Sequence, residues 1–386
     1  MKYLKLSILS LILGLAAGVL IWLVLMAMVV GMKVVWEIVP DYFSWSDNLV
    51  YDLAVCVLGG RLLAWVHRVF GPGPEPMFAV FARVQREGGY PYHNLHWLAL
   101  AFLLPIVFGG AVGPAAGITG FVAGLWTFVS ACINEGRWPG AKVRASRLPK
   151  RQRVVFYSIG ALAAVTSLAG LLVRVGGIHL PRFAREHAIG WSQWKWALAL
   201  IALGVVLAIL YTAVDAAATK MAERLAAHTS LMCVVTGGIV GVVAHYLPAI
   251  PFAGDVQLRL LFSSWTSYTV GVLLLAALLK MLLTIWCLHF GWGGGNFFPV
   301  IFIGTAASYA FTMFVEQCGA AGTLDENFAA ALVVSAMVGY LVRNPWASIA
   351  VLLCCFPLTY IIPLTVAVVV AGKVATGLTA YRRQSR

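Results

Sequence analysis

A run of glycines between two long apolar segments is the part of this sequence best suited to binding chemistry. Residues 291–299 read GWGGGNFFP, with Asn296 and Pro299 at positions that favour the start of a helix. Within a membrane, such flexible backbone is tolerated only where it faces protein or a water-filled cavity. A helix that starts there directs free N–H groups and its positive dipole end into the cavity, and such an end favours anions. Close packing of helices without a ligand is the alternative use of these glycines.

The composition places these glycines in a membrane protein. Of the 386 residues, 61% are hydrophobic and only 11% are charged, a balance typical of polytopic helical membrane proteins. We therefore expect a single all-α transmembrane domain over residues 1–386, with no soluble domain. The net charge of +13 reflects basic residues near the ends of apolar segments, so the expected partners are membrane lipids rather than nucleic acid.

Apolar runs and basic loops predict how the chain crosses the membrane. The run over residues 6–32 is too long for a signal-peptide core, so it is interpreted as a retained first span. The loop over residues 135–153 carries seven basic residues against one acid, Glu135, and is expected to be cytoplasmic. The basic C-terminal tail indicates the same side.

Two glycine-rich breaks divide the chain into approximate halves, residues 1–180 and 190–386. The first break, at residues 109–114, enters an apolar run just as residues 291–299 do. Broken helices at corresponding places in two halves are the best sequence indication of a substrate site near the membrane midplane.

The order of these motifs resembles the CLC family of chloride channels and proton-coupled chloride transporters. Residues 294–299 resemble the family's GxFxP motif, residues 110–114 occupy the place of its G(K/R)EGP motif, and residues 71–74 that of its GSGIP motif. The resemblance covers most of the chain and implies an inverted-repeat fold with broken helices meeting at the membrane midplane. It also implies a homodimer with one anion pathway per subunit and both termini in the cytoplasm. We expect the protein to lie in the cell inner (plasma) membrane.

The resemblance also assigns residues to the anion pathway. Backbone N–H groups at helix starts do not depend on side-chain identity, so Gly113, Gly295, Asn296 and Phe297 are expected to offer donors. Phe297 and Phe298 would wall the pathway, with packing in the core or against lipid as the alternative. The full expected set is Gly71, Pro72, Gly73, Pro74, Gly110, Val112, Gly113, Gly295, Asn296, Phe297, Phe298 and Thr376.

Departures from the family pattern bear on the transport mechanism. The gating glutamate falls at Val112, and there is no acid over residues 88–134. The segment that should carry a second, proton-relaying glutamate has no acid over residues 136–185. The serine of the inner anion site falls at Pro72, a substitution that accompanies a preference for nitrate in the family. The inner tyrosine falls near Thr376.

Isolated polar residues in apolar runs have competing interpretations. Lys280 is either functional or snorkels to an interface, Arg343 is expected to snorkel, and Asp215 either pairs with Lys220 or faces the cytoplasm. The histidines lack the spacing of a metal site, and the serines and cysteines show no nucleophile–base pattern. No metal, cofactor or enzymatic activity is therefore expected.

Together these features predict passive, channel-like transport of chloride or a similar small anion such as nitrate, without coupling to protons. One alternative is a proton-coupled chloride antiporter with an unusual relay. The other is a non-conducting family member that serves as a membrane scaffold.

Overall fold

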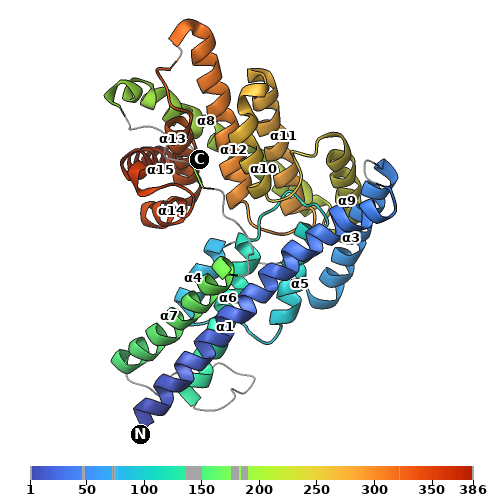
Figure 1. Cartoon of the computed structure of the whole chain (residues 1–386), viewed down its shortest axis with the longest axis vertical. Helices are drawn as coiled ribbons and strands as arrows, with labels where there is room; N and C mark the ends of the chain where they lie inside the picture. Colours follow the sequence, from blue (N-terminus) through green and yellow to red (C-terminus); the bar gives the residue numbers. More distant parts are fainter. Residues whose placement is uncertain are drawn as a thin grey trace. The chain divides into compact units, whose positions relative to one another are not determined.

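The protein is built from helices that are long and apolar enough to cross a membrane repeatedly (Figure 1). A computed structural model describes residues 2–45, 48–71, 73, 75, 77–135, 150–174, 182–183, 190–320 and 322–384. Every regular element within these ranges is a helix. Eight segments of this described part qualify as candidate spans, which confirms the predicted polytopic all-α class. Most of the basic loop expected in the cytoplasm lies outside the described residues.

The helices form two compact units whose segments alternate along the chain. The first unit comprises Met1–His179, Thr229–His245 and Gly291–Gly295, and the second comprises Leu180–His228, Tyr246–Phe290 and Asn296–Arg386. Two segments of the expected second half, one of them the glycine run, therefore belong to the first unit. One of the places where the chain passes from the first unit to the second falls between Gly295 and Asn296.

Small residues allow the helices of the first unit to pack closely. In Figure 1, α1 and α7 run side by side, and a Cβ built on Gly14 of α1 would lie 2.2 Å from the carbonyl oxygen of Gly160 in α7. Such contacts are typical of helix pairs in membranes, where close backbone approach replaces the hydrophobic effect as the driving force. The helices of this unit are α1 (Lys2–Lys33), α2 (Val39–Tyr42), α3 (Leu49–Phe70), α4 (Met77–Glu87), α5 (Leu95–Val107), α6 (Ala115–Glu135), α7 (Lys150–Arg174) and α9 (Thr229–Tyr246).

The pair α3 and α9 shows the same device together with a polar tie. Gly237 of α9 packs against the backbone of Cys56 in α3, and Gly241 packs against that of Asp52. One turn further along α9, Nδ1 of His245 lies 3.0 Å from a carboxylate oxygen of Asp52. The two helices are therefore antiparallel and in close contact, with their one carboxylate–imidazole pair satisfied internally.

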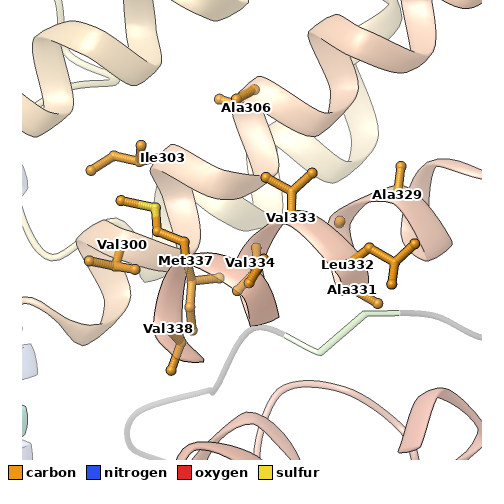
Figure 2. Packing of buried hydrophobic residues seen from close by; sticks show 14 of the residues in the cluster. Val300, Ile303, Ala306, Ala329, Ala331, Leu332, Val333, Val334, Met337 and Val338 are labelled. Carbon is orange, nitrogen blue, oxygen red and sulfur yellow. The ribbon is translucent and has the colours of Figure 1, made fainter. Parts of the chain in front are cut away.

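The second unit is organised around α12, which is surrounded by protein. In its span, 89% of residues are buried, compared with 28–56% in the other candidate spans. Figure 2 shows why: Val300 and Ile303 of α12 pack against Val333, Val334 and Met337 of α13. The helices of this unit are α8 (Ala197–Arg224), α10 (Asp255–Ser264), α11 (Val270–His289), α12 (Phe297–Val315), α13 (Glu326–Val342), α14 (Pro345–Leu352) and α15 (Ile361–Gln384).

Lys280 of α11 has a structural role in the second unit. Its side chain is fully buried, and Nζ donates to the carbonyl oxygens of Ile250, Pro251 and Phe252 at 2.7, 3.0 and 2.7 Å. An ammonium group has three donors, so the three carbonyls satisfy it completely. Lys280 therefore does not snorkel; it ties the turn before α10 to α11. Arg343, by contrast, is exposed at the C-terminal end of α13.

Replacing Lys280 with methionine should destabilise the protein. Lys280→Met keeps the length of the side chain but leaves three carbonyls of the turn without their donor, at a cost of about 2–4 kcal/mol. Thermal unfolding in detergent measures this loss. The matched control is Lys220→Met, at an exposed lysine near the end of α8, for which we expect a change within about 0.5 kcal/mol. Equal unfolding midpoints for the two variants would contradict the structural role of Lys280.

Candidate functional site

The two glycine-rich breaks meet within the first unit, with Gly73 of the motif over residues 71–74 beside them. Gly113 and Gly295 exchange two backbone hydrogen bonds, each N–H donating to the other residue's carbonyl oxygen at 2.6 Å. A Cβ built on Gly73 would lie 3.9 Å from Cα of Gly293. Segments that are far apart in the sequence therefore meet at the place that the motif pattern indicates.

Close backbone approach explains why these breaks are rich in glycine. A Cβ on Gly110 would lie 2.8 Å from the ring of Trp292, and one on Gly294 would lie 2.7 Å from Cβ of Val112. At Gly295 an added Cβ would lie 2.9 Å from the nearest backbone nitrogen. Real Cβ atoms do not approach other atoms this closely, so any larger residue would force the breaks apart.

The bridge between Gly113 and Gly295 corrects one sequence-based expectation. Both residues were expected to offer free N–H groups to an anion, but each N–H is already bonded to the other residue's carbonyl. The N–H of Val112 is also used, because it donates to the carbonyl of Gly110 at 2.8 Å. In this conformation the bridge supplies structure and not free donors.

Val112, at the expected gating position, is fully buried and packs against Gly294. Its isopropyl group has no polar atom and cannot bind a proton. The position that carries a carboxylate in the family motif is therefore filled here by an apolar side chain.

His67 is a polar neighbour of these breaks that sequence reasoning missed. It lies in the last turn of α3, and its Nε2 is buried without a hydrogen-bond partner among the described residues. Nε2 lies 3.5 Å from a Cβ built on Gly73, while Nδ1 lies 4.0 Å from the thiol of Cys233 in α9. The carbonyl of Cys233 accepts from Nε1 of Trp292 at 2.8 Å. No sequence signal connects these residues, because they are remote in the chain.

In the second unit, the expected helix start is present at α12. The N–H of Val300 donates to the carbonyl of Asn296 at 2.9 Å, which closes the first turn. Pro299 has no N–H. The first N–H groups of a helix have no acceptor within it, so Phe297 and Phe298 carry the two donors left over at this end. The ring of Phe298 is buried and meets that of Phe297 edge-on, with centroids 5.3 Å apart.

Two side chains of α8 contact residues that flank Gly291–Gly295, namely His289 before these glycines and Asn296 after them. Tyr211 Oη accepts a hydrogen bond from Nδ2 of Asn296 at 3.2 Å. One turn later, Oδ1 of Asp215 lies 2.8 Å from Nε2 of His289, the last residue of α11. Lys220 is therefore not the partner of Asp215; the partner that the structure shows is His289.

The remaining expected pathway residues are not brought to these contacts. Thr376 is exposed on α15, and its hydroxyl donates to the carbonyls of Gly372 and Lys373 in its own helix. Gly71 ends α3 with φ of +92°, a conformation that favours glycine. Pro72 and Pro74 lie outside the described residues.

Known proteins resemble this chain in sequence profile and in fold. The sequence profile described as "Voltage gated chloride channel" matches residues 150–376, more than half of the chain. A comparison with curated protein sequences gives no match.

Solved structures of the same fold are similar over nearly the whole chain. A slow cyanobacterial Cl⁻/H⁺ antiporter matches with a TM-score of 0.74 at 14% identity, covering 97% of this chain and 95% of that one. A CLC-type fluoride/proton antiporter matches with a TM-score of 0.64 at 15% identity, covering 96% and 95%. A eukaryotic CLC transporter matches with a TM-score of 0.65 at 14% identity, covering 97% of this chain and 72% of its own. Joined to the match of the sequence profile, this fold shows that the chain belongs to the voltage-gated chloride channel, or CLC, family.

Proposed function

We propose that the protein transports chloride or a similar small anion, such as nitrate, passively across a membrane and without coupling to protons. The observation that carries this proposal is Val112, an apolar, fully buried side chain at the gating position. A proton-coupled exchanger needs a group there that competes with the anion when ionised and carries a proton when neutral. A carboxylate near its normal pKa meets both conditions, and valine meets neither.

The anion-binding part of the proposal rests on backbone donors. The N–H groups of Phe297 and Phe298 lie at the positive end of the α12 dipole, where a negative ion is favoured. The paired aromatic rings of the same residues provide an apolar wall, which suits a narrow conducting path. The other pathway residues that we propose from the family motifs are Gly71, Pro72, Gly73, Pro74, Gly110, Gly113, Gly295, Asn296 and Thr376.

A proton-coupled mechanism is the second candidate, and His67 is the observation that favours it. The two solved structures with the full-length matches above are of proton-coupled antiporters. Among side chains, imidazole has the ordinary pKa that lies closest to neutral pH. The imidazole ring of His67 lies beside Gly73, and its Nε2 has no hydrogen-bond partner among the described residues. Coupling that depends on this relay should vanish in His67→Gln.

Flux measurements on purified protein in liposomes separate these candidates. We expect chloride-loaded liposomes to lose chloride when valinomycin and potassium clamp the voltage, with no accompanying proton uptake. Repeating the assay with nitrate gives the relative permeability of the two anions. Proton uptake driven by the outward chloride gradient would favour the antiporter, and release no faster than from protein-free liposomes would favour the non-conducting scaffold.

Introducing a carboxylate at the gating position should create pH-dependent block. In Val112→Glu the ionised side chain competes with the anion, so flux at neutral pH should fall several-fold. Flux should then rise as the pH is lowered and the glutamate is protonated, between about pH 7 and pH 4. The control is Val112→Gln, which has nearly the same size but does not titrate and should give a flux that is independent of pH. A shared pH response in both variants would show that side-chain bulk, and not charge, sets the flux.

The protein is also proposed to be a homodimer in the cell inner (plasma) membrane, with both termini in the cytoplasm. Apolar side chains cover the exposed faces of its spans, as at Leu162, Leu198 and Leu274, and the family fold supplies the partner as a second copy. Native mass spectrometry in mild detergent should give twice the mass of the chain. Monomer alone, under conditions that preserve anion binding, would contradict this prediction.

A further inference from the structure

Six exposed residues of α3 form one stripe along the helix, and the two halves of this stripe differ in chemistry. They recur every three or four residues, as one face of a helix requires: Val50, Ala54, Leu58, Arg61, Trp65 and Arg68. The first three are apolar, whereas the last three are basic or aromatic. Because α3 is a candidate membrane span, the stripe is placed to meet lipid or a partner protein.

Arg61 and Arg68 of this stripe have no carboxylate partner within the part of the chain that the structure describes. The one acid of α3, Asp52, is near the other end of the helix and already lies against a histidine of α9. The first acid after the helix, Glu75, pairs with Arg83 of α4. Ionisable residues in membrane spans usually face the protein interior and pair there. Two exposed arginines on one span therefore indicate an anion from outside the chain.

Aromatic rings gather beside these arginines. Trp65 is 52% exposed and meets Phe70 and Trp97 edge-on, with ring centroids 6.0 and 6.2 Å apart. The rings of Phe70 and Trp97 are stacked, with centroids 3.4 Å apart. Trp97 lies in the first turn of α5, which packs against α3 (Figure 1). Tryptophan is enriched where lipid headgroups meet hydrocarbon, so this end of α3 is expected at a membrane surface.

We propose that a basic–aromatic face, formed by Arg61, Trp65 and Arg68 of α3 and Trp97 of α5, binds an anionic phospholipid. A guanidinium group offers several N–H donors to phosphate oxygens, and the indole rings provide a flat apolar surface for the glycerol and upper acyl chains. The described part of the protein supplies no counter-charge here, so a negatively charged lipid satisfies both arginines. This inference goes beyond the proposed function, because lipid binding at this face does not require anion flux.

Topology and symmetry favour a lipid over a second copy of the chain as the occupant of this face. With the N-terminus in the cytoplasm, as proposed, α1 crosses outward and α3 returns, so the basic–aromatic face meets the cytoplasmic leaflet. The anionic lipids of that leaflet attract basic residues near its surface. A two-fold symmetric contact presents the same surface on both copies, so it would bring the arginines of the two chains together with no acid of this face between them.

Native mass spectrometry of the purified full chain in mild detergent measures lipid binding directly. The probes are phosphatidylglycerol and phosphatidylcholine with the same acyl chains; both contain a phosphate, but only phosphatidylglycerol has a net negative charge. Wild-type protein should bind phosphatidylglycerol at least about tenfold more tightly than phosphatidylcholine. Arg61→Gln and Arg68→Gln should each weaken phosphatidylglycerol binding about fivefold, the ratio that one basic residue near the surface is worth. Together they should weaken it about 25-fold and remove the preference.

Two further variants separate this face from general effects of charge and packing. Lys220→Gln with Arg224→Gln is the matched control, because the same charge is removed from exposed residues near the end of α8; it should change binding by less than about twofold. Trp65→Leu removes the indole ring but no charge, so it should weaken binding of both lipids by the same factor, about threefold, and leave the preference between them intact.

Three results would overturn the proposal. Equal binding of the two lipids by wild-type protein would show that no anionic lipid is selected. An equal loss of binding in the α8 control and in the double arginine variant would show that net charge, and not this face, attracts the lipid. Loss of the dimer mass in the double arginine variant, with lipid preference unchanged, would assign the face to a second copy of the chain. The single arginine variants decide the matter even if the double variant does not fold.

Discussion

Two hydrogen bonds between the backbones of Gly113 and Gly295 are the interaction on which the candidate site depends. Non-helical backbone inside a membrane protein persists only where its polar groups are paired or hydrated. The bridge pairs the N–H and carbonyl groups of both breaks without using a side chain. It also commits those groups to structure, so the donors left for the proposed anion site are the first N–H groups of α12, which begins two residues after Gly295.

Sequence reasoning predicted much of this fold because its signals were local. The spans follow from apolar runs, and the start of α12 follows from the glycines, Asn296 and Pro299. What the sequence could not provide is the identity of side-chain partners, since residues such as Tyr211 and Asn296 meet only in the folded chain. The error about free N–H groups at Gly113 has the same origin. In the sequence, one glycine-rich break suggests a set of free N–H donors. Only the folded chain shows that the N–H of Gly113 is hydrogen-bonded to the second break.

Three ionisable groups within the apolar helices, Lys280, Asp215 and Asp52, are paired internally, which limits their use in transport. Lys280 is satisfied by three carbonyls, while Asp215 and Asp52 each lie against a histidine. A buried charge without such partners would be costly in this environment. The carboxylates of Asp215 and Asp52 therefore have local structural roles. Neither is a free acid that could replace the carboxylate missing at Val112.

The physical basis of the site also explains how the sequence diverges while the fold persists. The similar solved structures share only 14–15% of their residues with this chain. Backbone donors and a backbone bridge place no demand on side-chain chemistry; they require only that no Cβ intrude. That requirement falls on a few positions, such as Gly110, Gly294 and Gly295, where an added atom would lie within 3 Å of its neighbours. A neighbouring residue such as Val112 is free of it, so a carboxylate at the proposed gating position can be lost while the proposed anion-binding helix start remains. On the proposed function, binding is a property of the main chain and coupling is a property of single side chains, so the second can change without the first.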